Sequence, residues 1–194
     1  MHGFISKGVL CFVRDVHGDE LYQTVIDTVG VDLQSPDLYL KADTTLPWRA
    51  MGVVSDVLGR SPDDLLDDFG TYLISHENTS ALRRLMRFSG QDFEDFLAGL
   101  PDLKPRVAMA IPGLELPRID VENYTSGASV RVFPGLDGYP QVIAGVIRAM
   151  ADDYGALVQV QLDPAADGFW MAQVVIIDSG FGTGRNFDLL VVQQ

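Results

Sequence analysis

Few side chains in this chain could ligate a metal ion or act as nucleophiles. The strongest candidates are three histidines and one cysteine: His2, His17, His76 and Cys11. His17 lies at a predicted helix end and His76 lies in a polar loop, so we interpret both as surface or capping residues. Cys11 falls among apolar residues at helical spacing and is interpreted as a small buried side chain. No Ser-His-Asp or Cys-His pattern is present, and we predict neither a metal centre nor an enzyme.

Two other patterns could bind ions, but each has a simpler explanation. The cluster Asp63, Asp64, Asp67 and Asp68 follows Ser61-Pro62, a strong helix start, where acidic residues complement the helix dipole and form a solvated face. The segment Gly180-Phe181-Gly182-Thr183-Gly184 resembles a phosphate-binding loop. However, no helix is predicted after it, and phosphate loops use the free amides of a helix start. We interpret this segment as a flexible hairpin connection.

The charge balance excludes several classes of partner. The 194 residues include 27 acidic and 14 basic side chains, which gives a net charge of −13. Nucleic acid and anionic membranes are therefore poor partners, because binding either relies on Lys and Arg. The one local basic cluster, Arg83, Arg84 and Arg87, is interpreted as a solvated helix face, with docking onto an acidic partner or ligand as the alternative. The N-terminus lacks the apolar core of a signal peptide, and we expect a cytoplasmic protein.

Apolar periodicity and capping residues predict helices first and strands later. Helices are predicted over residues 3–17, 19–29, 46–58, 62–73, 79–88, 91–100 and 139–154. Strands are predicted over residues 118–124, 128–133, 157–162, 170–177 and 187–192. The class is therefore α+β, with an N-terminal helical subregion followed by a strand-strand-helix-strand-strand antiparallel sheet. We expect one domain over residues 1–194, with a helical subregion to about residue 112, an α/β subregion from about residue 113, and a cleft between them.

Several strings along this pattern resemble the heme nitric-oxide/oxygen binding (H-NOX, or HNOB) family. The resembling strings are Met1-His2-Gly3-Phe4-Ile5, Phe12-Val13-Arg14-Asp15, Val57-Leu58-Gly59, Ser61-Pro62-Asp63-Asp64-Leu65-Leu66, Phe69-Gly70, Leu100-Asp102-Leu103, Pro112-Gly113 and Pro117-Arg118. They occur in the family's order over about 110 residues. The resemblance implies an H-NOX-like fold and a role in signalling, commonly beside histidine kinases or cyclic-nucleotide enzymes. It also implies a partner that is recognised in trans.

The resemblance also implies a heme site, but this chain departs from it at the proximal ligand. Heme-binding members hold iron through a histidine, and the matching string Leu103-Lys104-Pro105-Arg106-Val107 has Lys104 at that position. A protonated lysine offers a metal no lone pair. Because proline disfavours helical geometry in the preceding residue, we also expect Lys104 to be extended.

A second departure falls on the Tyr-x-Ser-x-Arg motif with which the family binds the heme propionates. An ungapped register places Phe133, Gly135 and Asp137 at its three positions. A one-residue shift places Pro134, Leu136 and Gly138 there, so neither register retains the motif. An aspartate in place of the arginine would repel the propionates. Lys104, Pro117 and these positions mark a degenerate heme site.

The resulting hypothesis is a sensor or interaction module with the H-NOX fold and no stable heme. One alternative is a functional heme-based nitric oxide sensor with a different axial ligand, and another is an enzyme acting on a small apolar molecule. An empty heme-sized space would be costly, so we expect bulky side chains to fill it in preference to an apolar ligand. The candidates for filling are Phe133, Leu136, Tyr139, Met109 and Leu114.

Overall fold

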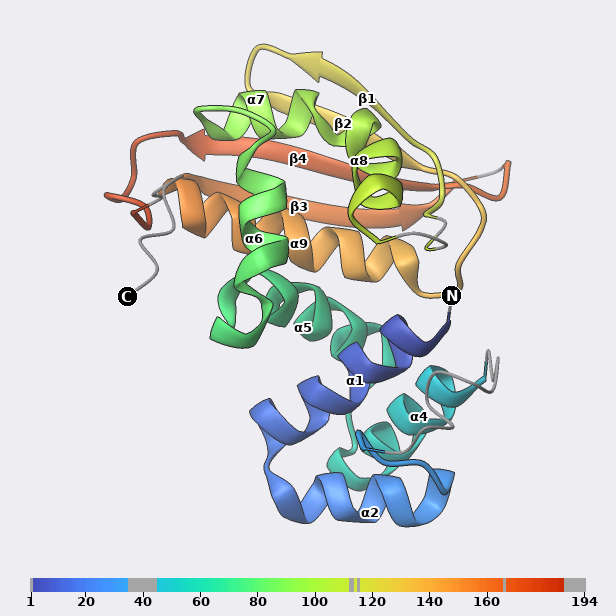
Figure 1. The fold of residues 1–194 in the computed structure, drawn as a ribbon. Helices are drawn as coiled ribbons and strands as arrows, with labels where there is room; N and C mark the ends of the chain where they lie inside the picture. The colour runs from blue at the N-terminus through green and yellow to red at the C-terminus, as the bar shows by residue number, and fades with distance from the viewer. Residues whose placement is uncertain (1, 35–44, 112–113, 115, 166, 187–194) are drawn as a thin grey trace.

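The N-terminal part of the chain is a group of four helices. The computed structural model describes residues 2–34, 45–111, 114, 116–165 and 167–186. The four helices are α1 (His2–His17), α2 (Asp19–Val29), α4 (Leu46–Leu58) and α5 (Pro62–Ser75). In Figure 1, α1, α2 and α4 lie together at one end of the molecule, and α5 lies between them and the sheet. None of the described helices is long and apolar enough to cross a membrane.

Capping residues set the helix ends much as their sequence positions predict. The Ser61 side chain accepts a hydrogen bond from the Asp64 amide (3.1 Å), and Pro62 occupies the first helical position of α5. α2 and α4 end at Gly30 and Gly59, which have positive φ values of 76° and 63°. The N-cap of α2 is Gly18, and Asp19 is the first residue of this helix.

Three shorter helices lead to the sheet, and one of them corrects a prediction. They are α6 (Ser80–Arg87), α7 (Phe93–Ala98) and α8 (Leu103–Ala110), with single 3-10 turns at Glu77–Thr79 and Leu100–Asp102. Lys104 was expected to be extended because Pro105 follows it, but both residues lie in the first turn of α8. Proline is tolerated there because the amide it lacks has no partner within the helix.

The C-terminal part is a four-stranded antiparallel sheet with one long helix against it. The strands are β1 (Ile119–Tyr124), β2 (Gly127–Val132), β3 (Leu157–Pro164) and β4 (Trp170–Asp178), in the order β1-β2-β4-β3. α9 (Tyr139–Tyr154) joins β2 to β3 and runs along the sheet (Figure 1). The predicted α+β class and strand-strand-helix-strand-strand order are confirmed. The predicted strand at 187–192 lies outside the described residues.

Two hydrophobic clusters meet on α5. One contains buried residues of α1, α2, α4 and α5, including Phe12 and Tyr72. The other contains Ile74 of α5 together with residues of α6 to α9 and of the sheet. The core therefore divides within α5, between Tyr72 and Ile74, and α6, α7 and α8 pack with the sheet.

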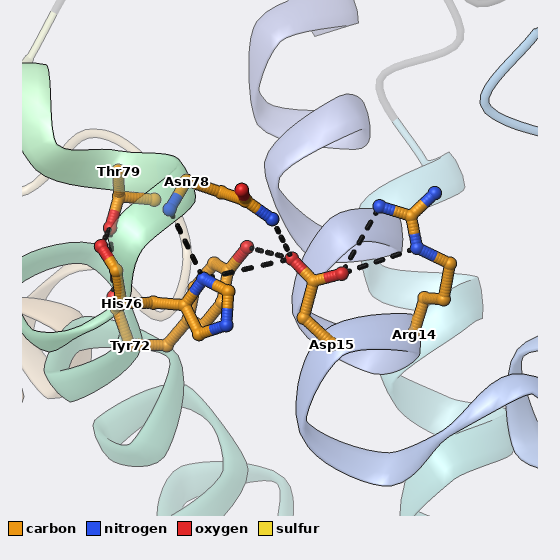
Figure 2. A network of polar contacts seen from close by, with 6 residues as sticks. All are labelled: Arg14, Asp15, Tyr72, His76, Asn78 and Thr79. Atoms are coloured by element: carbon orange, nitrogen blue, oxygen red, sulfur yellow. Dashed lines mark hydrogen bonds and ion pairs between the residues drawn. The ribbon is translucent and has the colours of Figure 1, made fainter.

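A polar network joins the end of α1 to the end of α5 (Figure 2). Asp15 accepts hydrogen bonds from the Tyr72 hydroxyl (2.8 Å), the Asn78 amide (2.7 Å) and the Arg14 guanidinium (3.1 Å). The His76 Nδ1 atom lies 3.8 Å from the same carboxylate. Burial alone would raise the pKa of Asp15, but these three hydrogen bonds together lower it below its ordinary value. The network therefore depends on an ionised Asp15.

Candidate functional site

An apolar cavity of about 230 Å³ lies where the two groups of elements meet. Its walls come from α1, α4 and α5 on one side and from α6, α8 and α9 on the other, with residues 111, 114, 116, 136 and 137 completing them. Representative wall residues are Ile5, Leu66, Met86, Val107 and Ile143. Asp137, which is exposed, is the only charged residue that lines the cavity among those the structure describes. The site is therefore suited to apolar, uncharged material.

Tyr139 is the polar feature of the cavity wall contributed by α9. It lies one helical turn before Ile143 and two turns before Val146, and all three residues line the cavity. The Tyr139 side chain is 7% exposed, and its hydroxyl has no hydrogen-bond partner among the described residues. Burial raises the pKa of this phenol, so it stays protonated. A buried donor without a partner costs about 1–3 kcal/mol, which a suitable acceptor would recover.

The residue at the proximal-ligand position does not reach the cavity. Leu103 and Val107 of α8 are buried and line it, whereas Lys104 between them is exposed. Neighbouring residues of a helix point about 100° apart, so the cavity side of α8 presents leucine and valine. Lys104 is therefore placed on the solvent side.

The predicted propionate positions are dispersed. The Arg118 guanidinium lies over the Phe133 ring, 4.9 Å from the ring centre. Phe133 also packs against Phe169, with the two ring centres 6.1 Å apart. Gly135 packs against the buried Pro117, leaving no room for a side chain there. Of these residues and Asp137, only Asp137 lines the cavity.

The shifted register gives a similar result. Leu136 lines the cavity, and Pro134 is exposed. Gly138, with φ 66°, approaches Leu66 and Trp48 so closely that a Cβ atom would clash. In either register, no basic side chain occupies a predicted propionate position.

The expectation that side chains fill the space is met only in part. Leu114, Leu136 and Tyr139 line the cavity as predicted, and its volume is below the roughly 300 Å³ at which ligand pockets usually begin. Two of the predicted filling residues are elsewhere, because Met109 is 77% exposed and Phe133 packs with Phe169. An internal space therefore remains, and it is smaller than the lower limit for drug-sized ligands.

Sequence reasoning missed the side of the cavity formed by the N-terminal helices. Trp48 and Leu66 lie in segments that were predicted only to be helical, and both line the cavity. Periodicity shows which face of a helix is buried but does not show what that face meets. The signal in the sequence that could have indicated the cavity is the clustering of large apolar side chains with a tyrosine at the start of α9.

His17, His76 and Cys11 are not among the residues that line the cavity. His17 packs its ring against Phe12, and burial lowers its pKa. His76 caps the end of α5 and accepts a hydrogen bond from the Asn78 amide (3.3 Å). Cys11 is half-buried, and burial raises the pKa of its thiol. Within the described ranges, no group of three or more His, Cys, Asp or Glu side chains could hold a metal ion.

Two charged clusters are largely occupied by internal ion pairs. Asp67 pairs with Arg148, and Asp68 pairs with Arg60. Arg83 and Arg87 were interpreted as a solvated face, but both point inward to Asp153, which is 1% exposed. The Arg83 Nε–Asp153 Oδ1 distance is 2.6 Å. The two arginines therefore stabilise the C-terminal end of α9, and only Arg84 of this cluster is exposed.

The glycine-rich segment packs against the end of α9. The Gly182 amide donates to the Gly155 carbonyl (2.8 Å), and the Arg185 amide donates to the Asp153 carbonyl (2.8 Å). A Cβ atom on Gly155 would clash with the backbone of Gly182. The segment therefore acts as a packed connection.

The fold consists of a helical group and a four-stranded antiparallel sheet that meet at the apolar cavity. The sequence pattern of the Haem-NO-binding family matches residues 2–162, and the chain belongs to this family. It is 21% identical over 154 residues to the soluble guanylate cyclase gcy-31 of Caenorhabditis elegans. That match covers 79% of this chain and 22% of the relative, so the chain spans about a fifth of that protein's length.

Solved structures of H-NOX domains share the fold. An H-NOX protein mutant from S. oneidensis in the Fe(II) ligation state superposes with a TM-score of 0.77 at 16% identity, covering 92% of this chain and 97% of that one. An Fe(II) unliganded H-NOX mutant from K. algicida superposes with a TM-score of 0.74 at 20% identity, covering 92% of this chain and 97% of that one. An oxygen-binding H-NOX domain related to soluble guanylate cyclases superposes with a TM-score of 0.71 at 17% identity, covering 96% of this chain and 100% of that one. The predicted H-NOX resemblance is confirmed at the level of family and fold.

The residues at this site do not fit the heme that the family name implies. The cavity volume of about 230 Å³ is below the roughly 300 Å³ at which ligand pockets usually begin. Anionic propionates would meet Asp137 and no lining Lys or Arg among the described residues. Among the described lining residues, Met86, Tyr139 and Asp137 carry atoms that could ligate iron, and Tyr139 is held as the neutral phenol.

Proposed function

We propose that this chain is a non-enzymatic sensor or signalling module of the Haem-NO-binding family that does not bind heme in the family manner. The observation that carries the proposal is the placement of Lys104 on the solvent side of α8, while Leu103 and Val107 face the cavity. An exposed lysine cannot supply an axial ligand to a group inside the cavity. Asp137 at the cavity supports the same conclusion from the propionate side.

The proposed output is regulation of a signalling partner, in the cytoplasm. The family resemblance and the guanylate cyclase relative support a partner of the histidine kinase or cyclic-nucleotide enzyme class. The net charge of −13 disfavours nucleic acid and anionic membranes as alternatives. Residues of α5 and α9 both line the cavity, so its occupation is the event to which the partner would respond.

Purification after growth with excess heme precursor tests the proposal. The expected result is protein without a Soret-region absorption band and without stoichiometric iron. A heme-binding H-NOX domain expressed in parallel serves as the positive control for heme supply. A Soret band with one iron per chain would overturn the proposal and support the heme-sensor alternative. In that case Met86→Leu, which removes the thioether at nearly constant volume, would test whether Met86 is the ligand.

A further inference from the structure

The Tyr139 hydroxyl is the starting point, because it is buried, belongs to a cavity residue and has no partner in the described part of the chain. Most buried hydroxyl groups in folded proteins have a hydrogen-bond partner. Phenylalanine would fill the same volume without this cost. The hydroxyl therefore points to an acceptor that arrives with a ligand.

The remaining walls limit what that ligand can be. The described lining is apolar apart from Tyr139, the indole of Trp48 and the exposed Asp137. A buried charge would have no opposite charge deep in the cavity, so the ligand is neutral. A volume of about 230 Å³ restricts it to a compact molecule.

We propose that the cavity binds a compact, neutral, largely apolar molecule with one hydrogen-bond acceptor, and that Tyr139 donates its phenolic hydrogen to this acceptor. The inference rests on the proposed function, since heme and this ligand would need the same space. It assigns two roles to the walls. The apolar residues supply most of the affinity by excluding water, and Tyr139 selects molecules with a carbonyl-type oxygen over isosteric hydrocarbons.

An isosteric pair of probes tests the role of Tyr139. Fluorinated acetophenone carries the carbonyl oxygen, and fluorinated α-methylstyrene has the same shape with a methylene group in its place. Fluorine NMR titration of the heme-free protein gives a dissociation constant for each. Because a carbonyl group is better hydrated than a methylene group, the informative quantity is the ratio of the two dissociation constants. We expect Tyr139→Phe to shift this ratio about 3- to 10-fold against the ketone, the range that one hydrogen bond provides, while the affinity for α-methylstyrene stays unchanged.

A second pair of variants tests the location. Leu136 lines the cavity and is half-buried, so Leu136→Trp should place an indole in the space and abolish binding of both probes. Leu157→Trp adds the same side chain at an exposed position at the start of β3 and should leave both dissociation constants unchanged.

Three outcomes would overturn the inference: no saturable binding of either probe, a ratio of dissociation constants that is the same in Tyr139→Phe as in the unmodified protein, or binding that survives in Leu136→Trp. If Tyr139→Phe does not fold, the ratio for the unmodified protein is compared with the ratio of the two probes' partition between water and cyclohexane, and a ketone that binds no better than this partition predicts would overturn the inference. The heme measurement is separate. Stoichiometric heme uptake would overturn the proposed function, whereas an unshifted ratio in heme-free protein would overturn only this inference.

Discussion

Leu103 and Lys104 are adjacent on α8 but have opposite surroundings. Leu103 is 3% exposed and lines the cavity, and Lys104 faces solvent. If Lys104 occupies the proximal position, as the sequence predicts, both the residue type and its direction would disfavour heme, because this helix position faces away from the cavity.

Restoring the histidine alone should not restore heme binding. In Lys104→His the imidazole would lie on the solvent side of α8, and Asp137 would still face the propionates. We expect no Soret band and no tight uptake when the purified variant is titrated with hemin. Stoichiometric heme binding by this single variant would show that α8 can rotate and that the cavity can open.

Asp15 should make stability depend on pH in the acid range. Its folded-state pKa lies below the ordinary value of 3.8, so the unfolded chain binds the proton more readily. The stabilisation is fully present above the unfolded-state pKa and is lost as pH falls through the folded-state pKa. Asp15→Asn should lower the free energy of unfolding at neutral pH by about 1–3 kcal/mol, the cost of disrupting buried hydrogen bonds to a charged group. Urea denaturation at several pH values measures this.

The deficit of Asp15→Asn relative to the unmodified protein should shrink as pH falls from about 6 to about 3, because the carboxylate of the unfolded chain takes up a proton at higher pH than the native carboxylate does. The exposed Asp56 of α4 provides the control, and Asp56→Asn should change stability by less than about 0.5 kcal/mol. A deficit for Asp15→Asn that is constant across this range would show that the network does not need the charge.

At the scale of elements, α5 and α9 cross at two glycines. A Cβ atom on Gly70 would clash with the Val142 carbonyl, and one on Gly145 would clash with the Asp67 carbonyl. Glycine lets the two backbones approach, and this close crossing joins the helical group to the helix that covers the sheet. The crossing therefore fixes the separation of two walls of the cavity.

Replacing one of these glycines should separate the two helices. We expect Gly145→Ala to reduce the free energy of unfolding by about 1–3 kcal/mol or more, the usual cost of overpacking. Gly52→Ala in α4 is the matched control, because a Cβ atom there meets nothing within 4 Å. Removing a helical glycine should stabilise the protein by about 0.5–1 kcal/mol. Equal effects of the two substitutions, measured by thermal unfolding, would argue against the close crossing.

The sequence predicted the elements well because their signals are local. Ser61, Gly30 and Gly59 end or begin helices through contacts within a few residues of themselves. Lys104 was wrongly expected to be extended. The preference for extended geometry that Pro105 imposes is weaker than the stabilisation gained by including Lys104 in the first turn of α8. The sequence placed Tyr139 near the cavity, but it could not show that the hydroxyl lacks a hydrogen-bond partner. The residues around that hydroxyl come from helices that are distant in sequence.

At the scale of the whole molecule, α5 belongs to both hydrophobic clusters. Tyr72 packs in the cluster of the N-terminal helices, and Ile74, two residues later, packs in the cluster of the sheet. Asp15 fixes Tyr72 from α1, and the glycine crossing fixes α5 against α9. Neither cluster is complete without α5, so we predict that the chain unfolds as one cooperative unit, although the sequence changes character near residue 112.

Cleavage of the chain near that change tests the prediction. A protease site placed between Ile111 and Arg118 would separate the segment with α1 to α8 from the segment with the sheet and α9. The fragments should co-elute in size-exclusion chromatography and unfold in a single transition, because cleavage leaves the α5–α9 crossing and the sheet cluster in place. The uncut protein with the same inserted site controls for the insertion. Fragments that separate and each retain a cooperative transition would show two independent domains, and the cavity would then be a surface between them.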